Sequence, residues 1–571
     1  MNEQTFSLSD IWRRGFSLCN YLITLGALTG LFFVAFEPSL GSNATYQNFA
    51  NSSDSFFYYI YFLHLLLGLL YAGRLSSFFK HHFFDIVFFA PLLFINFKEV
   101  HSAHILLIKQ GLHFFSTHLG HYTLGHFADS IARKPSRLVL SSFFGVIILG
   151  TFILVLPISV APGHEPSLLT ALFTSTSAVC VTGLIVVDTP VYFSTFGQIG
   201  ILMLIQIGGL GLMTLSAGIS LIAGKKMAMS QTSMMQEMLD LSDVSSLKST
   251  LKSIFLWAFL IEAIGAVILS TRFYILTKCC LADAVFTGIF HSISAFCNAG
   301  FSTFSDSLMG FNGDPVINFT IMGLIVTGGL GFVVLSSISV FLRGARNQRM
   351  NTHAYMVLTV SILLIFAGTL IIFVLETDSP AMSNLSISEK IMAALFQSVS
   401  TRTAGFNTID FSSLKTSTLF FMSMLMFIGA SPGSTGGGIK TTTFATLILF
   451  MRTKLRGETQ VSLRGRGIAD ETILKAFLIV AISAILIFTF VFLLILTENH
   501  DLIKIIFEAF SAFATVGLST GITSALTTSG KLLIIVLMFI GRTGPLTMAL
   551  SITAQGIRSG IRYPDTRILV G

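Results

Sequence analysis

Residues 168–189 read LLTALFTSTSAVCVTGLIVVDT, and the same pattern returns three more times along the chain. It reads DAVFTGIFHSISAFCNAGFSTF at 283–304, KIMAALFQSVSTRTAGFNTID at 390–410 and IKIIFEAFSAFATVGLSTGIT at 503–523. Each stretch has an aromatic, apolar part, a serine-rich end, and then one glycine followed by an apolar residue. The glycines are Gly183, Gly300, Gly405 and Gly517, with spacings of 117, 105 and 112 residues. A shared motif at a near-constant spacing indicates an internal repeat.

Each of these stretches lies between two longer apolar segments. About 20 residues of helix are needed to cross ~30 Å of hydrocarbon. We expect such spans, in pairs, at 138–157 and 196–222, 252–270 and 316–341, 355–375 and 416–449, and 472–496 and 531–556. The intervening stretch is too short to span. It can enter the membrane as a half-helix and return as extended chain only where protein or water covers its backbone.

Four such segments around one axis would bring the four glycines together. Glycine permits backbone conformations that aim successive carbonyl oxygens inward, and a ring of carbonyls replaces the hydration shell of a cation. The partly negative C-terminal ends of the half-helices would point at that ion. In the alternative, each glycine is only a turn between helices, which leaves their common phase unexplained.

The composition is that of a membrane protein. Of 571 residues, 53% are hydrophobic and 11% are charged, whereas soluble proteins carry about 25% charged residues. The net charge of +7 gathers in short loops, which the positive-inside rule places in the cytoplasm; they contain Lys225–Lys226, Arg343–Arg346–Arg349, Lys454–Arg456–Arg464–Arg466 and Arg558–Arg562. No basic stripe or reader motif accompanies them, which argues against a nucleic-acid partner.

At these residues the sequence resembles the Trk/Ktr/HKT superfamily of potassium transporters, over about 137–571. The resemblance implies an all-α integral membrane fold of four fused helix–pore-loop–helix repeats, like potassium-channel subunits, near 137–225, 250–345, 353–452 and 470–560. It also implies that the filter residues are Val181, Thr182 and Gly183; Asn298, Ala299 and Gly300; Thr403, Ala404 and Gly405; and Thr515, Val516 and Gly517. Four filter glycines look like the potassium-selective branch of this superfamily.

The third pair of spans contains an interruption, FIGASPGSTGGGIKTTT at 427–443. Glycine and proline are poor helix formers, so an ordinary helix cannot continue through it. In the superfamily such a break forms an intramembrane loop below the filter that acts as a gate. The resemblance assigns this role to Gly429, Gly433, Gly436, Gly437 and Gly438. The alternative is a cytoplasmic loop between two shorter spans.

Apart from Lys531 at its first position, Arg542 is the sole charge of the last span. An arginine at that depth is costly unless it faces a polar partner, and the superfamily places one beside the gate; snorkelling to the interface is the alternative. Arg402 precedes the third filter segment, either as a pore-mouth charge or as a scaffold contact. Glu262 and Glu508 are lone acids that we expect to bond to nearby donors.

Residues 1–132 are expected to form additional N-terminal membrane helices of unknown role, near 20–37, 55–72 and 83–97, ahead of a conducting domain at 133–571. The segment 37–55 has no Lys or Arg, which predicts an outer loop.

The sequence predicts a transporter and no enzyme, because it has no HExxH motif, paired intramembrane carboxylates or Ser/Lys pair. We therefore expect no catalytic residue and no cofactor in this chain. The resemblance implies potassium uptake across the cell membrane through a gated pore that binds K⁺ at the filter residues, with passive or cation-coupled flux. It further implies a homodimer in membrane lipid, regulated by separate cytoplasmic nucleotide-binding subunits. A sodium-selective or unselective cation transporter and a non-transporting membrane subunit remain the alternatives.

Overall fold

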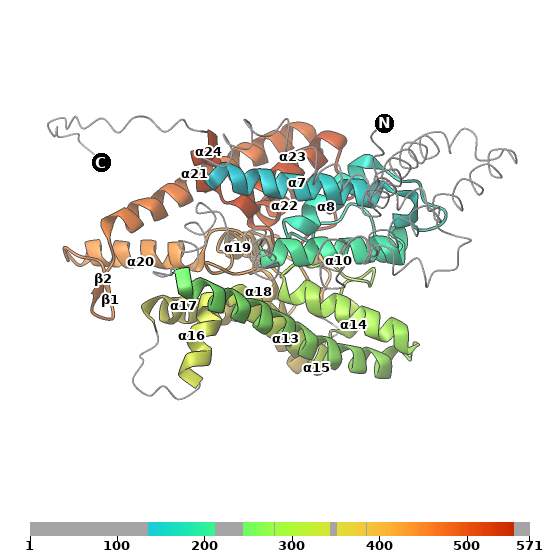
Figure 1. Cartoon of the computed structure of the whole chain (residues 1–571), viewed down its shortest axis with the longest axis horizontal. Helices are drawn as coiled ribbons and strands as arrows, with labels where there is room; N and C mark the ends of the chain where they lie inside the picture. The colour runs from blue at the N-terminus through green and yellow to red at the C-terminus, as the bar shows by residue number, and fades with distance from the viewer. Residues whose placement is uncertain (1–134, 212–243, 279, 343–350, 384, 553–571) are drawn as a thin grey trace, which may run out of the picture. The chain divides into compact units, whose positions relative to one another are not determined.

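The computed structural model describes residues 135–211, 244–278, 280–342, 351–383 and 385–552 (Figure 1). The chain divides into two compact units at Arg133 and Lys134, and every described residue belongs to the second unit. The helices and the outer loop predicted for 1–132 lie outside the described residues. So do the basic loops around Lys225 and Arg558.

The described part of the chain is almost entirely helical, as predicted. Its helices are α7 (Pro135–Val155), α8 (Leu168–Val179), α9 (Thr189–Tyr192), α10 (Thr195–Leu210), α13 (Val244–Thr277), α14 (Leu281–Phe296), α15 (Pro315–Leu330), α16 (Phe332–Leu342), α17 (Thr352–Glu376), α18 (Ile387–Ser400), α19 (Thr416–Phe427), α20 (Thr441–Leu455), α21 (Asp470–Thr497), α22 (Leu502–Ala514), α23 (Thr528–Thr543) and α24 (Pro545–Ile552). Short 3₁₀ turns lie at Pro157–Ser159, Met309–Phe311 and Phe411–Ser413. A two-residue antiparallel hairpin joins β1 (Ser462–Leu463) to β2 (Arg466–Gly467).

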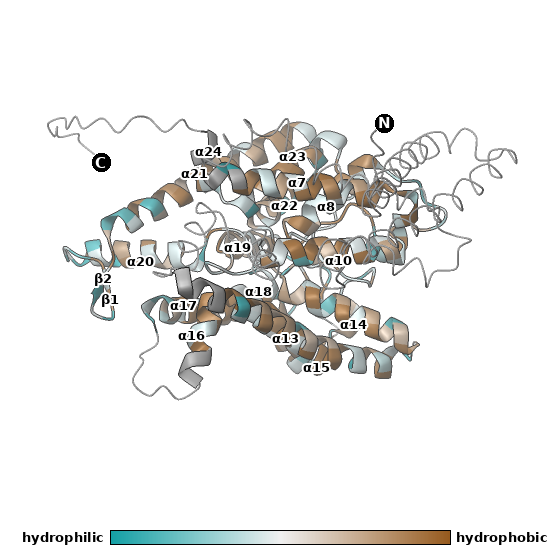
Figure 2. Ribbon diagram, in the orientation of Figure 1, coloured by the Kyte–Doolittle hydropathy of each residue, from teal (hydrophilic) through white to brown (hydrophobic). Residues whose placement is uncertain are grey.

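Within the described ranges, three helices are long and apolar enough to cross a membrane: Leu251–Thr277 of α13, α17 and α21. Figure 2 colours much of α13 and α21 as hydrophobic. A bent pair, Pro315–Leu330 with Phe332–Ile338, also passes as one span with a 103° bend. Each of the shorter helices α8, α14, α18 and α22 lies in the chain between the two helices of one pair. These pairs are α7 and α10, α13 and α15, α17 and α19, and α21 and α23.

The second helix is interrupted in the second, third and fourth pairs, whereas the sequence predicts an interruption only for the third. The unbroken spans expected at 316–341 and 531–556 are wrong, because α15 ends at Leu330 and α23 ends at Thr543, each followed by a C-cap glycine, Gly331 or Gly544, at a φ of 89°. In the first pair, α10 ends at Leu210, and its C-cap Gly211 has a φ of 80°. Left-handed backbone is unstrained in glycine and ends a helix.

In three of the pairs a polar contact joins the end of the first helix to the start of the second. Glu376, at the end of α17, accepts a hydrogen bond from the backbone N–H of Lys415 at 3.0 Å and another from the Thr418 hydroxyl. Glu498, after α21, accepts one from the N–H of Thr527 at 3.1 Å. In the second pair, Arg272 forms an ion pair of 2.7 Å with Asp314, the N-cap of α15. These contacts satisfy backbone donors that a helix start leaves free.

Replacing Glu376 with alanine is expected to lower the free energy of unfolding by about 1–3 kcal/mol, because buried donors lose their acceptor. The side chain of Glu376 is fully buried, so water cannot replace it without rearrangement. A lower Tm of the detergent-solubilised protein would show this effect. Glu458→Ala removes an exposed carboxylate and should leave the Tm unchanged; equal Tm values for both variants would contradict the expectation.

Candidate functional site

Four short buried helices end directly before the four predicted filter tripeptides. The helices α8, α14, α18 and α22 end within three residues of Val181, Asn298, Thr403 and Thr515 respectively. The first residue and the glycine of every tripeptide have a positive φ, between 51° and 92°, whereas the middle residue does not. Alternation of the sign of φ turns successive carbonyls toward the same side of the chain. For the β-branched Val181, Thr403 and Thr515 this conformation is strained, and such strain gathers at functional sites.

The four tripeptides face one another in a closed ring. A Cβ atom added at Gly183, Gly300, Gly405 or Gly517 would lie within 2.8 Å of the middle carbonyl oxygen of the next tripeptide. In that order the opposing oxygens belong to Ala299, Ala404, Val516 and Thr182, so the fourth tripeptide closes on the first. Only glycine permits this approach, because real Cβ atoms do not come so close to an oxygen.

Serines near the ends of the short helices fix the tripeptides. The N–H of Gly183 donates to Ser177 Oγ at 3.0 Å, and that of Gly517 donates to Ser511 Oγ at 3.1 Å. In the second repeat, Ser294 Oγ donates to the carbonyl oxygen of Phe301 at 2.8 Å. The serine-rich ends of the motif therefore anchor the backbone that follows them.

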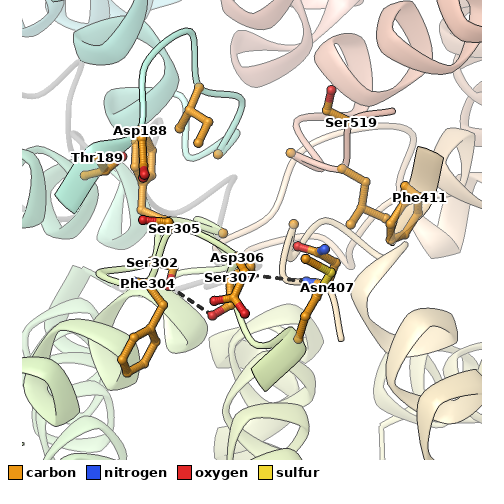
Figure 3. Close-up of a pocket in the computed structure, with 18 residues that line it drawn as sticks. Asp188, Thr189, Ser302, Phe304, Ser305, Asp306, Ser307, Asn407, Phe411 and Ser519 are labelled. Carbon is orange, nitrogen blue, oxygen red and sulfur yellow. Dashed lines mark hydrogen bonds between the residues drawn. The ribbon is translucent and has the colours of Figure 1, made fainter. Parts of the chain in front are cut away.

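A cavity of about 170 Å³ lies directly over the four glycines (Figure 3). Segments from all four repeats surround it, and its labelled lining includes Asp188, Asp306, Asn407 and Ser519. Among the described residues, neither Asp188 nor Asp306 forms an ion pair. The wall of the cavity therefore carries two carboxylates without an ion-pair partner among the described residues.

The interruption between α19 and α20 lies on the other side of the ring. A Cβ on Gly436 would overlap Thr403 Oγ1, and one on Gly437 would overlap Thr515 Oγ1. The loop is also bonded to the end of α15, where the N–H groups of Ser431 and Thr435 donate to the carbonyls of Gly329 and Gly328 at 3.1 and 3.3 Å. The loop is thus packed between the tripeptides and the end of α15.

Arg542 bridges this loop to another repeat. Its Nη1 donates to the carbonyl oxygen of Thr435 in the loop, and its Nη2 donates to that of Gly208 near the end of α10. The side chain is partly buried, and its guanidinium binds these two carbonyls inside the protein. Two charge-assisted hydrogen bonds hold the loop at this position.

The ends of α10, α15 and α23 share a sequence signal that lies outside the tripeptide segments. It reads IGGLG at 207–211, TGGLG at 327–331 and IGRTG at 540–544. Arg542 thus stands where the first two repeats have Gly209 and Gly329. The repeat is therefore visible in the sequences of the second helices as well as in the tripeptide segments.

The remaining charges are bound within the scaffold. Arg402 Nη2 donates to Ser361 Oγ at 3.1 Å on α17, which makes Arg402 a scaffold contact and not a pore-mouth charge. Glu262 accepts from Gln206 Nε2 at 3.1 Å, and Glu508 accepts from Thr523 Oγ1 at 2.8 Å. The prediction that both acids bond to nearby donors is confirmed.

No group of three or more His, Cys, Asp or Glu side chains with metal-binding geometry occurs among the described residues.

Residues 136–556 match the family described as TrkH, a cation transport protein. The Ktr system potassium uptake protein B of Bacillus subtilis (strain 168) is 42% identical over 438 residues, which cover 76% of this chain and 97% of that protein. The potassium/sodium uptake protein NtpJ of Enterococcus hirae is 35% identical over 444 residues, covering 77% and 97%. The solved potassium transporter TrkH of Vibrio parahaemolyticus has a similar fold, with a TM-score of 0.62, 20% identity, and coverage of 86% and 97%.

Proposed function

Because the chain belongs to the TrkH family of membrane-embedded cation transport proteins, we propose that it takes up potassium ions across the cell membrane through the ring of four tripeptides. The observation that carries this proposal is the closed succession in which each filter glycine faces a carbonyl oxygen of the next repeat. The name of the Bacillus relative, a potassium uptake protein, supports potassium as the ion.

In this proposal the four units are pore-loop repeats. The alternation of φ in each tripeptide aims carbonyl oxygens at the common axis, where they replace water around a dehydrated K⁺. The C-terminal ends of α8, α14, α18 and α22 add partial negative charge. The ring binds the ion through backbone oxygens, and the serine hydroxyls that bond to the tripeptides hold these oxygens in place. Selectivity therefore depends on the position of the backbone.

The potassium-uptake assay in cells that lack their own uptake systems tests this function. Growth at low external potassium, and uptake that saturates with potassium, support it. Expression in the membrane without uptake contradicts it.

A second candidate, transport of sodium as well as potassium, is favoured by the name of the Enterococcus relative, a potassium/sodium uptake protein. Each repeat supplies only a short tripeptide, which offers fewer coordinating layers than a longer filter. Uptake of the two ions measured in parallel separates the candidates, because a potassium-selective pore leaves sodium uptake at the level of empty cells.

We also propose that the carboxylates over the ring concentrate cations at the mouth. Asp188→Asn together with Asp306→Asn should raise the KM for potassium about two- to fivefold at low ionic strength. The reason is that a cavity lined by negative charges raises the local concentration of cations, and the substitutions remove these charges. The difference should shrink when an impermeant salt is added. Asp378→Asn, an exposed carboxylate outside this cavity, is the control. A lower maximal rate with unchanged KM would contradict this role.

The loop at 428–440 and Arg542 form the gate in this proposal. The loop contacts the first residues of two tripeptides, Thr403 and Thr515, and Arg542 donates a hydrogen bond to the carbonyl oxygen of Thr435 in the loop. Opening then requires the loop to leave these contacts.

Two further assignments rest on the resemblance of the sequence. The protein would work as a homodimer, and separate cytoplasmic nucleotide-binding subunits would regulate it. Co-purification of such subunits with the full chain, and its mass in detergent, test these assignments.

A further inference from the structure

The half-helix α20, which follows the loop, is loosely packed on two flanks. A crevice of about 420 Å³ lies between α20 and α21, with α19 and α22 also contributing to its walls. A second crevice of about 240 Å³ lies between α20 and α17. Both crevices are open at the protein surface, and no other part of the described chain fills them. A helix with open space on both sides can shift more easily than one that is enclosed.

The larger space, called here the α20–α21 crevice, reaches both ends of the loop. Its walls include Ile428, just after α19, and Ile439, just before α20. These two residues pair across the base of the loop as a parallel bridge, and the N–H of Gly429 donates to the carbonyl of Ile439 at 2.9 Å. Whatever occupies the crevice therefore touches the residues at which the loop begins and ends.

The walls of the crevice are apolar and open toward the lipid. They are formed by Met424, Phe427, Ile428, Ile439, Phe444, Leu447, Ile448, Met451, Val480, Ala484, Ile487, Phe488 and Phe510. Phe488 is 70% exposed and Met424 is 54% exposed, as apolar side chains on the lipid-facing helices of a membrane protein are. The surrounding solvent at this depth is hydrocarbon, so the chemistry that fits is an acyl chain.

Basic side chains stand at one end of the crevice. Arg452 directly follows the wall residue Met451, and Lys475 precedes Val480 by five residues, about 7 Å along a helix. The rings of Phe450 and Phe477, 5.4 Å apart, hold these ends of α20 and α21 together, and Lys454 lies 5.8 Å over the Phe450 ring. This end of the two helices and the adjoining hairpin is hydrophilic in Figure 2.

Arg452, Lys454 and Lys475 constitute an exposed basic cluster. None of the three forms an ion pair with another residue in the described part of the chain. The acids Asp470 and Glu471 begin α21 a turn or more farther from the crevice. The positive-inside rule places the cluster at the cytoplasmic leaflet, where anionic lipids supply phosphate groups.

We propose that an anionic phospholipid binds here, with an acyl chain in the α20–α21 crevice and its phosphate at the basic cluster. The bound chain fills space beside α20 and stabilises one position of α20 and of the loop. The lipid thereby sets how readily the pore conducts. The effect on conduction rests on the proposed function, whereas the binding site itself does not.

Native mass spectrometry of the full chain, titrated with phosphatidylglycerol or phosphatidylcholine, measures the binding. Arg452→Gln with Lys475→Gln should weaken phosphatidylglycerol binding roughly 25-fold, at about fivefold for each basic side chain at a membrane surface. Ala484→Phe should weaken the binding of phosphatidylglycerol by filling the crevice. The matched controls are Ala481→Phe, at an exposed position of α21 outside the walls, and Lys504→Gln with Lys531→Gln. Controls that bind like the parent complete the expected result.

Equal binding of both lipids, or binding that none of the crevice variants alters, would overturn the lipid site. Disulfide cross-linking between two chains that carry Ile448→Cys and Phe488→Cys would overturn it as well, because a second copy would then occupy the crevice.

Potassium flux into vesicles with and without phosphatidylglycerol tests the second part. The parent should differ between the two vesicles, and Ala484→Phe should not. Lipid binding without any such difference overturns the coupling to the loop. Absence of transport in all vesicles overturns the proposed function, while the mass measurement still decides the lipid site.

Discussion

Gly517→Ala is expected to reduce potassium uptake by more than about tenfold, which corresponds to only ~1.4 kcal/mol in the barrier. Gly517 has a φ of 92°, and a Cβ there would overlap the carbonyl oxygen of Thr182. An alanine in left-handed conformation costs roughly 1–2 kcal/mol. The larger effect comes from the displaced Thr182 carbonyl, because that oxygen belongs to the proposed coordination ring.

The chain supplies a matched control four residues later. Gly521 has the same φ of 92°, but a Cβ there meets nothing within 4 Å. Gly521→Ala therefore introduces the backbone strain without displacing an oxygen, and it should keep most of the uptake. Equal losses in the two variants would show that strain alone is responsible and would remove the support for the ring.

Gly405→Ser tests selectivity at the same ring. A Cβ on Gly405 approaches the carbonyl of Val516 at 2.5 Å, so the serine must move one coordinating oxygen while adding another. The ratio of potassium to sodium uptake should fall. Unchanged ratios after single substitutions of all four glycines would contradict the filter assignment.

Arg542→Gln is expected to raise potassium flux by about tenfold or more without changing ion preference. The substitution removes charge-assisted bonds to Thr435 and Gly208, each of which contributes about 1.5–3 kcal/mol in typical cases, while the tripeptides keep their own anchors. The rate of uptake at saturating potassium, with the potassium-to-sodium ratio measured in the same cells, checks both statements.

Two comparisons sharpen this experiment. Arg542→Lys keeps the charge but cannot reach two carbonyls in a fixed fork, so its flux should lie between those of the parent and Arg542→Gln. Deletion of Gly436–Gly438 shortens the loop and should raise flux in the same way. Because both changes act on one contact, their combination should add little to either alone. Altered selectivity, or fully additive effects, would place the loop outside the gate.

The tripeptides were predictable because their signal is local and repeated. A serine-rich helix end followed by one glycine recurs four times, and glycine is the residue that a left-handed, crowded backbone position requires. The loop at 428–440 was predictable for the same reason, since Pro432 and a run of glycines cannot continue a helix. The breaks at Gly331 and Gly544 were missed because their signal is shorter than that of the loop: two or three scattered glycines inside an apolar run lower helix propensity but do not always end a helix.

The sequence by itself determined the helical membrane fold and the positions of the four repeated glycines and of the loop. Only the tertiary structure decided which oxygen each glycine faces and what Arg542 binds, because these partners are far apart in the chain: Thr435 by 107 residues and Gly208 by 334. The crevices beside α20 were also beyond the sequence. Apolar residues facing lipid and apolar residues facing a void have the same pattern, and only the packing of several helices distinguishes them.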